Sequence, residues 1–367
     1  MGKRSNGEGS VVKRKDGRWC AAYTVGGKRK YLYGKTRKEV VGKLRDTLAE
    51  SGGACYPDIA VGDYLNRWLE DSVKESVRAS TYERYESVCR VHINPYVGGK
   101  RLAALTEMDV QSLYRERLGS GCSPRIVQYV HVTLHKALKQ AVRWRLVPRN
   151  VAEAAVPPRV QKKEIGVLSP AQAKVFLRSV EGHRLEAMFA LAVTTGMRQG
   201  EMTGLRWEDV DLEDGTLYVL RTLSKTRDGI VFNRPKTAKG RRSVALTHLA
   251  IGALKKHRAR QQAEKGSWKE DHGLVFPNIH GEPRSQREPM IKALKKALER
   301  AGLPVVRFHD LRHTAATLML SKGVHPKIVS EMLGHGDVAF TLTVYSHVLK
   351  GMQKGAAQAI DEALGGA

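Results

Sequence analysis

Apolar and polar residues alternate along the first part of the chain, between about residues 10 and 34. Such a period of two is typical of strands with one buried face. Asp16-Gly17 and Gly26-Gly27 are turn pairs at hairpin separation. The inward positions of the middle strand are Trp19, Ala21, Tyr23 and Val25. A Thr36-x-x-Glu39 capping box then predicts a helix to about Glu50, so we expect a small three-stranded sheet with one helix behind it.

A helical period replaces the alternation after a linker at residues 51–57, and residues 58–155 have the pattern of an all-α domain. Ser80-x-x-Glu83, Thr106 and Ser123-Pro124 are predicted helix starts, and residues 92–98 interrupt the pattern. The first helix is marked by Val61, Tyr64, Leu65 and Trp68. The helix from Ser123 to about Trp144 carries Arg125, His131, His135, Lys136, Lys139 and Arg143. We predict four or five short helices with a basic surface.

The last 200 or so residues are predicted to be mainly helical, with a β-rich insertion at about residues 215–247. The proline pair in Val156-Pro-Pro-Arg159 and a polar stretch at 160–164 indicate a boundary. Ser169-Pro170 is a strong helix start, because a capping residue is followed by proline at the first helical position. The expected fold is therefore multidomain and mainly α, with one small N-terminal sheet and one β-rich insertion.

The charge balance suggests a polyanionic partner. The chain has 63 Lys and Arg against 37 Asp and Glu, a net charge of +26. Residues 1–55 carry 14 basic and 5 acidic side chains, residues 56–164 carry 18 and 12, and residues 165–367 carry 31 and 20. An excess in every part suits a protein that wraps DNA, although a solvated basic surface gives the same composition.

Cysteine usage and hydropathy indicate a place inside the cell. The four cysteines show neither a disulfide framework nor zinc-ligand spacing. The N-terminus is polar and basic without the apolar core of a signal peptide, and the apolar run at residues 187–193 is too short to span a membrane. We expect a cytoplasmic protein. We find no P-loop and no clustered carboxylates with metal-ligand spacing, so no cofactor or metal is expected.

Five polar motifs stand out in the C-terminal part. They are Thr195-Gly-x-Arg198-x-x-Glu201, Pro235-Lys236-Thr237, His309-x-x-Arg312, Leu333-Gly334-His335 and Tyr345. Each alone has an ordinary structural explanation: a surface ion pair, a solvated turn lysine, or a core tyrosine. Arg198 and Glu201 are three residues apart and face the same side of a predicted helix, so the carboxylate can fix the guanidinium.

In this order and at these spacings, the five motifs resemble the tyrosine recombinase family, which includes phage integrases. The resemblance covers nearly all of residues 165–350 and implies a catalytic set with Tyr345 as the nucleophile: Arg198, Lys236, His309, Arg312, His335 and Tyr345. Lys239 is the alternative to Lys236, and Glu201 is implied to be a supporting acidic residue. His313 and His347 receive no role.

The resemblance also implies a domain plan. Residues 1–55 are similar to an arm-type DNA-binding domain, residues 56–160 to a helical, SAM-like core-binding domain, and residues 161–350 to the catalytic domain. Residues 351–367 resemble a C-terminal tail that docks on a neighbouring protomer. The implied partners are double-stranded DNA at attachment sites, three further copies of the chain in a tetramer, and an accessory DNA-bending or excision factor.

The implied activity is site-specific recombination that integrates or excises a phage or other mobile element through a 3′-phosphotyrosine intermediate. Two arginines can fork onto the phosphate oxygens as negative charge builds up on them. His309 is the expected proton acceptor for Tyr345, and Lys236 the expected proton donor to the leaving 5′ oxygen. Three alternatives remain open at this point: a DNA-binding regulator without chemistry, a metal-dependent nuclease or transposase, and a type IB topoisomerase.

Overall fold

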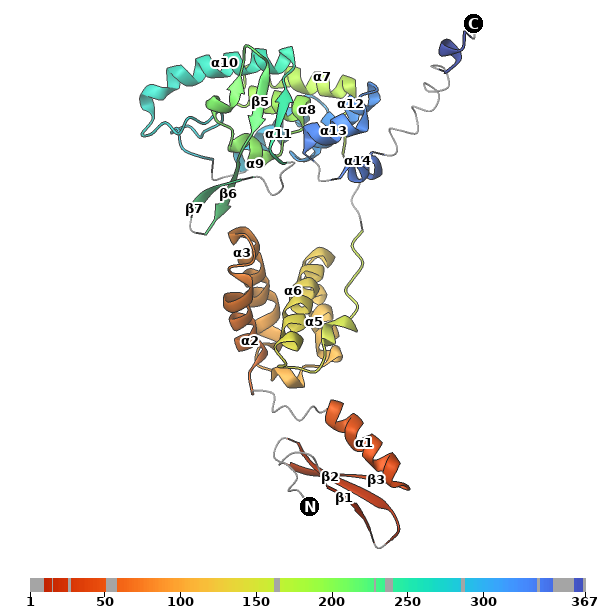
Figure 1. Cartoon of the computed structure of the whole chain (residues 1–367). Coiled ribbons are helices and arrows are strands. Elements are labelled where there is room, and N and C mark those ends of the chain that lie inside the picture. The colour runs from red at the N-terminus through yellow and green to blue at the C-terminus, as the bar shows by residue number, and fades with distance from the viewer. Residues whose placement is uncertain are drawn as a thin grey trace. The chain divides into compact units, whose positions relative to one another are not determined.

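The computed structural model describes residues 10–14, 16–25, 28–50, 58–161, 166–227, 229–234, 240–284, 288–334, 337–345 and 360–365. The chain divides into two compact units, residues 1–162 and 163–367 (Figure 1). The first contains a sheet with one helix and a group of helices, and the second contains helices and two small sheets. The predicted mainly α, multidomain fold is confirmed.

Three antiparallel strands form the first sheet, in the order β1 (Ser10–Lys13), β2 (Trp19–Val25) and β3 (Lys28–Gly34). Helix α1 (Arg37–Glu50) packs on this sheet. Its core consists of Ala21 and Tyr23 from β2 with Val40 and Leu44 from α1. The predicted cap of α1 is confirmed, because the amide of Glu39 donates to Thr36 Oγ1 over 3.2 Å.

The helical group of the first unit follows α1 and consists of α2 (Val61–Trp68), α3 (Ala79–Val88), α4 (Asn94–Val97), α5 (Glu107–Gly119) and α6 (Pro124–Arg143). The predicted caps of α5 and α6 are confirmed, because Thr106 and Ser123 accept from the amides of Asp109 and Ile126. The aromatic residues Tyr64 and Tyr114 are fully buried among aliphatic side chains, so this group of helices has its own core.

Two predictions in this region are wrong. Helix α3 begins at Ala79, with Arg78 in extended conformation as its N-cap, so Ser80 lies inside the first turn and does not cap the helix. The predicted break at residues 92–98 is also wrong, because the chain stays helical up to Val97. A π-helical segment, Cys89–Ile93, leads directly into α4. Pro95 is tolerated there because it lies in the first turn of α4.

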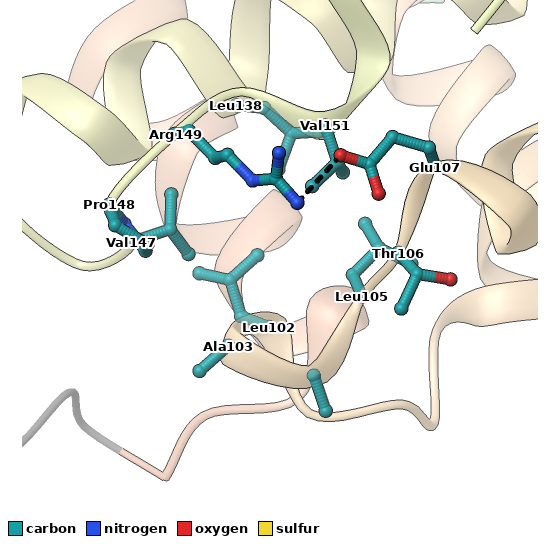
Figure 2. A pocket seen from close by; sticks show the side chains of 11 residues that line it. Leu102, Ala103, Leu105, Thr106, Glu107, Leu138, Val147, Pro148, Arg149 and Val151 are labelled. Atoms are coloured by element: carbon teal, nitrogen blue, oxygen red, sulfur yellow. Dashed lines mark ion pairs between the residues drawn. The ribbon is translucent and has the colours of Figure 1, made fainter. Parts of the chain in front are cut away.

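A polar pocket lies between the start of α5 and the residues that follow α6 (Figure 2). Glu107 and Arg149 face each other across it and form an ion pair of 2.9 Å. The pocket contains none of the six predicted catalytic residues. We therefore look for the chemistry in the second unit.

The helices of the second unit are α7 (Pro170–Ser179), α8 (Glu186–Thr195), α9 (Gln199–Thr203), α10 (His248–Glu264), α11 (Glu288–Arg300), α12 (Asp310–Ser321), α13 (Pro326–Leu333) and α14 (Val338–Val344). The strands are β4 (Val210–Asp211), β5 (Thr216–Val219), β6 (Thr222–Thr226), β7 (Gly229–Asn233) and β8 (Arg242–Ala245). They form a sheet of order β4-β5-β8 and the β6-β7 hairpin, so the predicted β-rich insertion is confirmed. Ser169 caps α7 as predicted.

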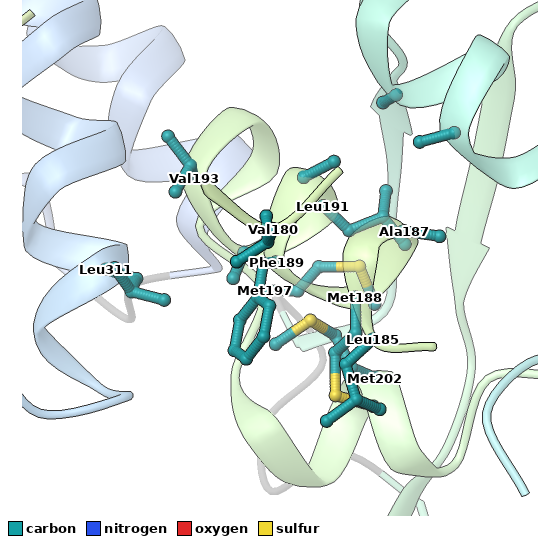
Figure 3. Close-up of a cluster of buried hydrophobic side chains, with 14 of the residues drawn as sticks. Val180, Leu185, Ala187, Met188, Phe189, Leu191, Val193, Met197, Met202 and Leu311 are labelled. Carbon is teal, nitrogen blue, oxygen red and sulfur yellow. The ribbon is translucent and has the colours of Figure 1, made fainter. Parts of the chain in front are cut away.

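Helix α8 is apolar and buried along residues 187–193, as expected of a helix that packs into the core on most of its sides. Figure 3 shows Met188 and Phe189 of α8 close to Met197 and Met202, with Leu311 of α12 nearby. Even Thr195 at its end is buried, and its hydroxyl donates to the Leu191 carbonyl over 2.6 Å. The C-terminal end of α8 is thus a firmly packed support for the residues that follow it.

Candidate active site

The first motif begins with a left-handed glycine. Gly196 ends α8 with φ +63, a conformation that favours glycine. A Cβ atom there would lie 2.4 Å from Leu333 Cδ2, so any larger residue would force the buried Leu333 side chain to shift. Its carbonyl accepts a 2.8 Å hydrogen bond from Arg312 Nη1. The Thr-Gly motif and the His-x-x-Arg motif are therefore joined through the main chain.

Arg198 is the N-cap of α9 and is fixed by two partners. Its Nη1 donates to Glu201 over 2.8 Å, which confirms the predicted pair. Its Nη2 donates over 3.1 Å to the carbonyl of Gly334, the left-handed residue that ends α13. The side chain is still 41% exposed, so the guanidinium is positioned and open to solvent.

Glu201 is shared with a second arginine that the sequence reasoning missed. Arg242, at the start of β8, donates to Glu201 over 2.9 Å and to the Met332 carbonyl over 2.6 Å. Burial acts to raise the pKa of Glu201, but the hydrogen bond from Arg242 and the charges of Arg242 and Arg198 outweigh it and hold that pKa below its usual value. Glu201 therefore stays ionised and orients both arginines.

Arg312 on α12 is 3% exposed. Burial, together with the nearby charge of Arg198, lowers the pKa of Arg312 to about 9, so the group remains positive at neutral pH. Its buried Nη2 forms no hydrogen bond with any of the described residues. A buried cation with an unpaired donor favours an anionic ligand, since the ligand would satisfy both.

His309, His313 and Tyr345 form a chain of neighbouring rings. His309 is the N-cap of α12 and is exposed, and its ring lies edge-on to His313 with centroids 5.4 Å apart. Nδ1 of His313 lies 2.7 Å from the Tyr345 hydroxyl. Burial raises the pKa of Tyr345 to about 12, although the charge of Arg312 acts in the opposite direction. This contact of His313 was not predicted, because the sequence gives no sign of it.

Contacts among the described residues thus link four predicted residues in two groups: Arg198 and Arg312 with the glycine carbonyls, and His309 and Tyr345 with His313. Lys236 and His335 lie outside the described residues, as do Lys239 and His347. Within the described ranges, no group of three or more His, Cys, Asp or Glu side chains is placed to hold a metal ion. No helix of those ranges is long and apolar enough to cross a membrane.

Comparison with known families agrees with this geometry. Residues 164–352 match the phage integrase family, and residues 60–118 match the phage integrase N-terminal SAM-like domain. The chain belongs to the phage integrase family. It is therefore a tyrosine recombinase, an enzyme of site-specific DNA recombination.

The similarity extends over nearly the whole chain. A protein named tyrosine recombinase XerC-like, from Caldanaerobacter subterraneus subsp. tengcongensis, is 31% identical over 91% of this chain and 92% of its own length. An integrase of Streptomyces ambofaciens is 30% identical over 94% of this chain and 93% of its own length.

Solved structures show the same fold. The Tn1549 transposon integrase in complex with transposon right end DNA has a TM-score of 0.70 at 19% identity, covering 81% of this chain and 100% of its own. A lambda integrase tetramer bound to a Holliday junction has a TM-score of 0.57 at 19% identity, covering 89% of this chain and 95% of its own. Both likenesses support the mainly α, multidomain fold.

Proposed function

We propose that Arg198, Lys236, His309, Arg312, His335 and Tyr345 carry out DNA cleavage and rejoining in this recombinase. The observation that carries the proposal is the buried guanidinium of Arg312, whose Nη2 has no acceptor among the described residues. Arg198 is close enough to lower the pKa of Arg312 through its charge. A phosphodiester that binds between these two arginines would relieve their repulsion and satisfy the free donor.

The chemistry follows from this arrangement. The Tyr345 oxygen attacks phosphorus, and the two arginines stabilise the charge that grows on the non-bridging oxygens. His309 takes the phenol proton, Lys236 gives a proton to the leaving 5′ oxygen, and His335 supports the charged phosphate. The product is a 3′-phosphotyrosyl bond and a free 5′ hydroxyl. Reversal on another strand rejoins DNA without an outside energy source.

Covalent trapping on a nicked suicide substrate that carries the attachment site tests this proposal. We expect the wild-type chain to form an adduct and Tyr345→Phe to form none, because phenylalanine lacks the attacking oxygen. An adduct in Tyr345→Phe would exclude Tyr345 as nucleophile. The absence of any wild-type adduct would instead favour a DNA-binding regulator. Loss of activity in EDTA would favour a metal-dependent nuclease. Relaxation of any plasmid, whatever its sequence, would favour a type IB topoisomerase.

We also propose that residues 1–55 bind arm-type DNA sites. Tyr31 and Tyr33 of β3 are 52% and 45% exposed. The guanidinium of Arg29 lies over Tyr31, and that of Arg14 over Tyr33. A basic and aromatic ribbon of this kind fits a major groove. Removal of residues 1–55 should abolish arm-site binding and leave core-site binding.

Residues 56–160 are proposed to hold the core site and residues 161–350 to cut it. In the helical group, the guanidinium groups of Arg84 and Arg125 both lie over Tyr129. Lys136 of α6 donates to the Tyr85 hydroxyl over 2.6 Å. These basic side chains on α3 and α6 form a surface suited to the phosphate backbone. Double-stranded DNA is thus the proposed partner of every domain.

For the tail, residues 351–367, we propose docking on a neighbouring protomer in a tetramer. Ile360 and Leu364 are 59% and 81% exposed. The second unit has a groove with an apolar floor that includes Leu177, Val193, Leu318 and Met319, and its rim carries Lys174, Arg178 and Lys322 along with Glu181. Asp361 and Glu362 give the tail a charge opposite to most of that rim.

Deletion of residues 351–367 tests the docking. The truncated chain should still form the covalent adduct on a half-site but should lose the tetramer on DNA. A tetramer of unchanged stability would exclude this role for the tail. Integration or excision of a mobile element, with an accessory DNA-bending or directionality factor, is the proposed setting in the cell.

A further inference from the structure

Tyr345 is stored inside the protein, although its oxygen has to reach phosphorus. The residue is 1% exposed and packs with Leu320, Val329 and Leu333. Its hydroxyl lies 2.7 Å from Nδ1 of His313. Tyr345 has to leave this position, or its surroundings have to open, before DNA can be cut.

The hydrogen bond has a defined direction. Burial raises the pKa of Tyr345 to about 12, so the phenol keeps its proton at neutral pH. Burial, followed by the charge of His309, lowers the pKa of His313 to about 4, so the imidazole is neutral. The hydroxyl therefore donates and Nδ1 accepts, which places the ring proton on Nε2.

We propose that His313 is a positioning residue that retains the nucleophile in this buried position, and that its hydrogen bond to Tyr345 has to break before strand cleavage. The inference rests on the proposed function, in which Tyr345 is the nucleophile. Arg312 and His313 are consecutive on α12, so the residue that binds the phosphate lies next to the residue that retains the tyrosine. DNA binding and release of Tyr345 thus involve one helix.

The expected size of the effect follows from the bond that is lost. A typical net hydrogen bond shifts a two-state population by about 2- to 10-fold. His313→Leu removes the acceptor, whereas His313→Asn keeps an acceptor oxygen at the δ position. Tyr345→Phe removes the donor from the other side. These three variants separate the hydrogen bond from the packing of the ring.

Amide hydrogen exchange of residues 338–345 in the free, full-length protein measures the retention directly. We expect exchange to be about 2- to 10-fold faster in His313→Leu and in Tyr345→Phe than in the wild type, and near the wild-type rate in His313→Asn. The double variant with His313→Leu and Tyr345→Phe should exchange no faster than either single variant, because both remove the same hydrogen bond. Exchange unchanged in both His313→Leu and Tyr345→Phe would overturn the proposal. Tyr345→Phe keeps the test decisive if His313→Leu does not fold.

The rate of adduct formation on the nicked suicide substrate, at saturating DNA in a single turnover, gives the second readout. His313→Leu should form the adduct about 2- to 10-fold faster, because more of the enzyme has Tyr345 free. An unchanged or lower rate would overturn retention. If the wild-type chain forms no adduct, the proposed function fails, and hydrogen exchange still decides whether His313 retains Tyr345.

Discussion

The guanidinium groups of Arg198, Arg242 and Arg312 are fixed to main-chain carbonyls, whereas the hydroxyl of Tyr345 is held by one side chain, His313. These arginines, the arginine half of the site, lie on α12, at the start of α9 and at the start of β8, and their carbonyl partners lie at the ends of α8 and α13. The tyrosine half stands at the end of α14, a helix of seven residues. In the proposed mechanism, this difference means that the phosphate-binding surface is formed in advance and that Tyr345 is delivered to it.

Such a division has a physical advantage for an enzyme that cuts DNA. Charge stabilisation is most effective when the donors need no rearrangement during the reaction. A nucleophile that is always exposed would attack any phosphate that reaches the arginines. Storage of Tyr345 separates DNA binding from cleavage without weakening the anion site.

The largest expected effect is on the arginine half. Arg312→Ala should lower the cleavage rate by about 10²- to 10³-fold, because a contact that strengthens in the transition state is lost. Binding of the intact site should fall far less. Single-turnover cleavage and gel-shift titration measure the two quantities, and equal losses in both would mean that Arg312 only binds DNA.

The next effect tests how firmly the arginines are held. Glu201→Ala removes the carboxylate that Arg198 and Arg242 share, and the side chain of Arg242 is only 7% exposed. Breaking a buried ion pair costs about 3–5 kcal/mol of unfolding free energy. Glu208→Ala is the matched control, because Glu208 is 60% exposed and its ion pairs are worth about 1 kcal/mol or less. Urea unfolding of both variants measures the difference, and similar losses would contradict a buried anchor.

A smaller effect is expected where α8 meets α13. Gly196→Ala forces a methyl group against Leu333 and should cost about 1–3 kcal/mol from overpacking, beyond the strain of the left-handed backbone. Gly182→Ala has a similar φ, +74, but a Cβ there meets nothing within 4 Å. The difference in melting temperature between the two variants measures the packing cost. Equal melting temperatures would contradict a tight contact between Gly196 and Leu333.

The last effect is the pH dependence of stability in the tyrosine half. His313 has a pKa of about 4 in the folded chain and about 6.5 when unfolded, so the unfolded state binds more protons between these values. Its stabilising contribution is complete above pH 6.5 and is lost as pH falls toward 4. Relative to His313→Asn, the wild-type protein should therefore lose unfolding free energy in this window. Parallel stability curves from pH 7 to pH 4 would contradict the assignment.

Local signals in the sequence predicted much of the fold. Helix starts at Thr36, Thr106, Ser123 and Ser169 were predicted because a cap is a contact within three residues. The same reasoning failed at Ser80, since Arg78 begins α3 without any side-chain cap. Hydrophobic periodicity also gave no sign of the π-helical segment that carries the chain through residues 89–93.

In the candidate site, too, some residues could be predicted from the sequence and others could not. The motif residues Arg198, Glu201, His309, Arg312 and Tyr345 could be selected from their order along the chain. Arg242 could not, because its contact with Glu201 spans 41 residues and no local pattern marks it. The contact between His313 and Tyr345 spans 32 residues and depends on how α12 and α14 pack. Long-range partners of this kind follow from tertiary structure.

The carbonyls of Gly196 and Gly334 have a consequence for protein engineering. A main-chain oxygen cannot be deleted by exchanging a side chain, so Arg312 and Arg198 keep these anchors when neighbouring residues are varied. Libraries that alter DNA preference can therefore randomise the surrounding surface, provided that the two glycines remain. The hydroxyl of Tyr345, the proposed nucleophile, has no such protection, because its only hydrogen bond among the described residues is to an exchangeable imidazole.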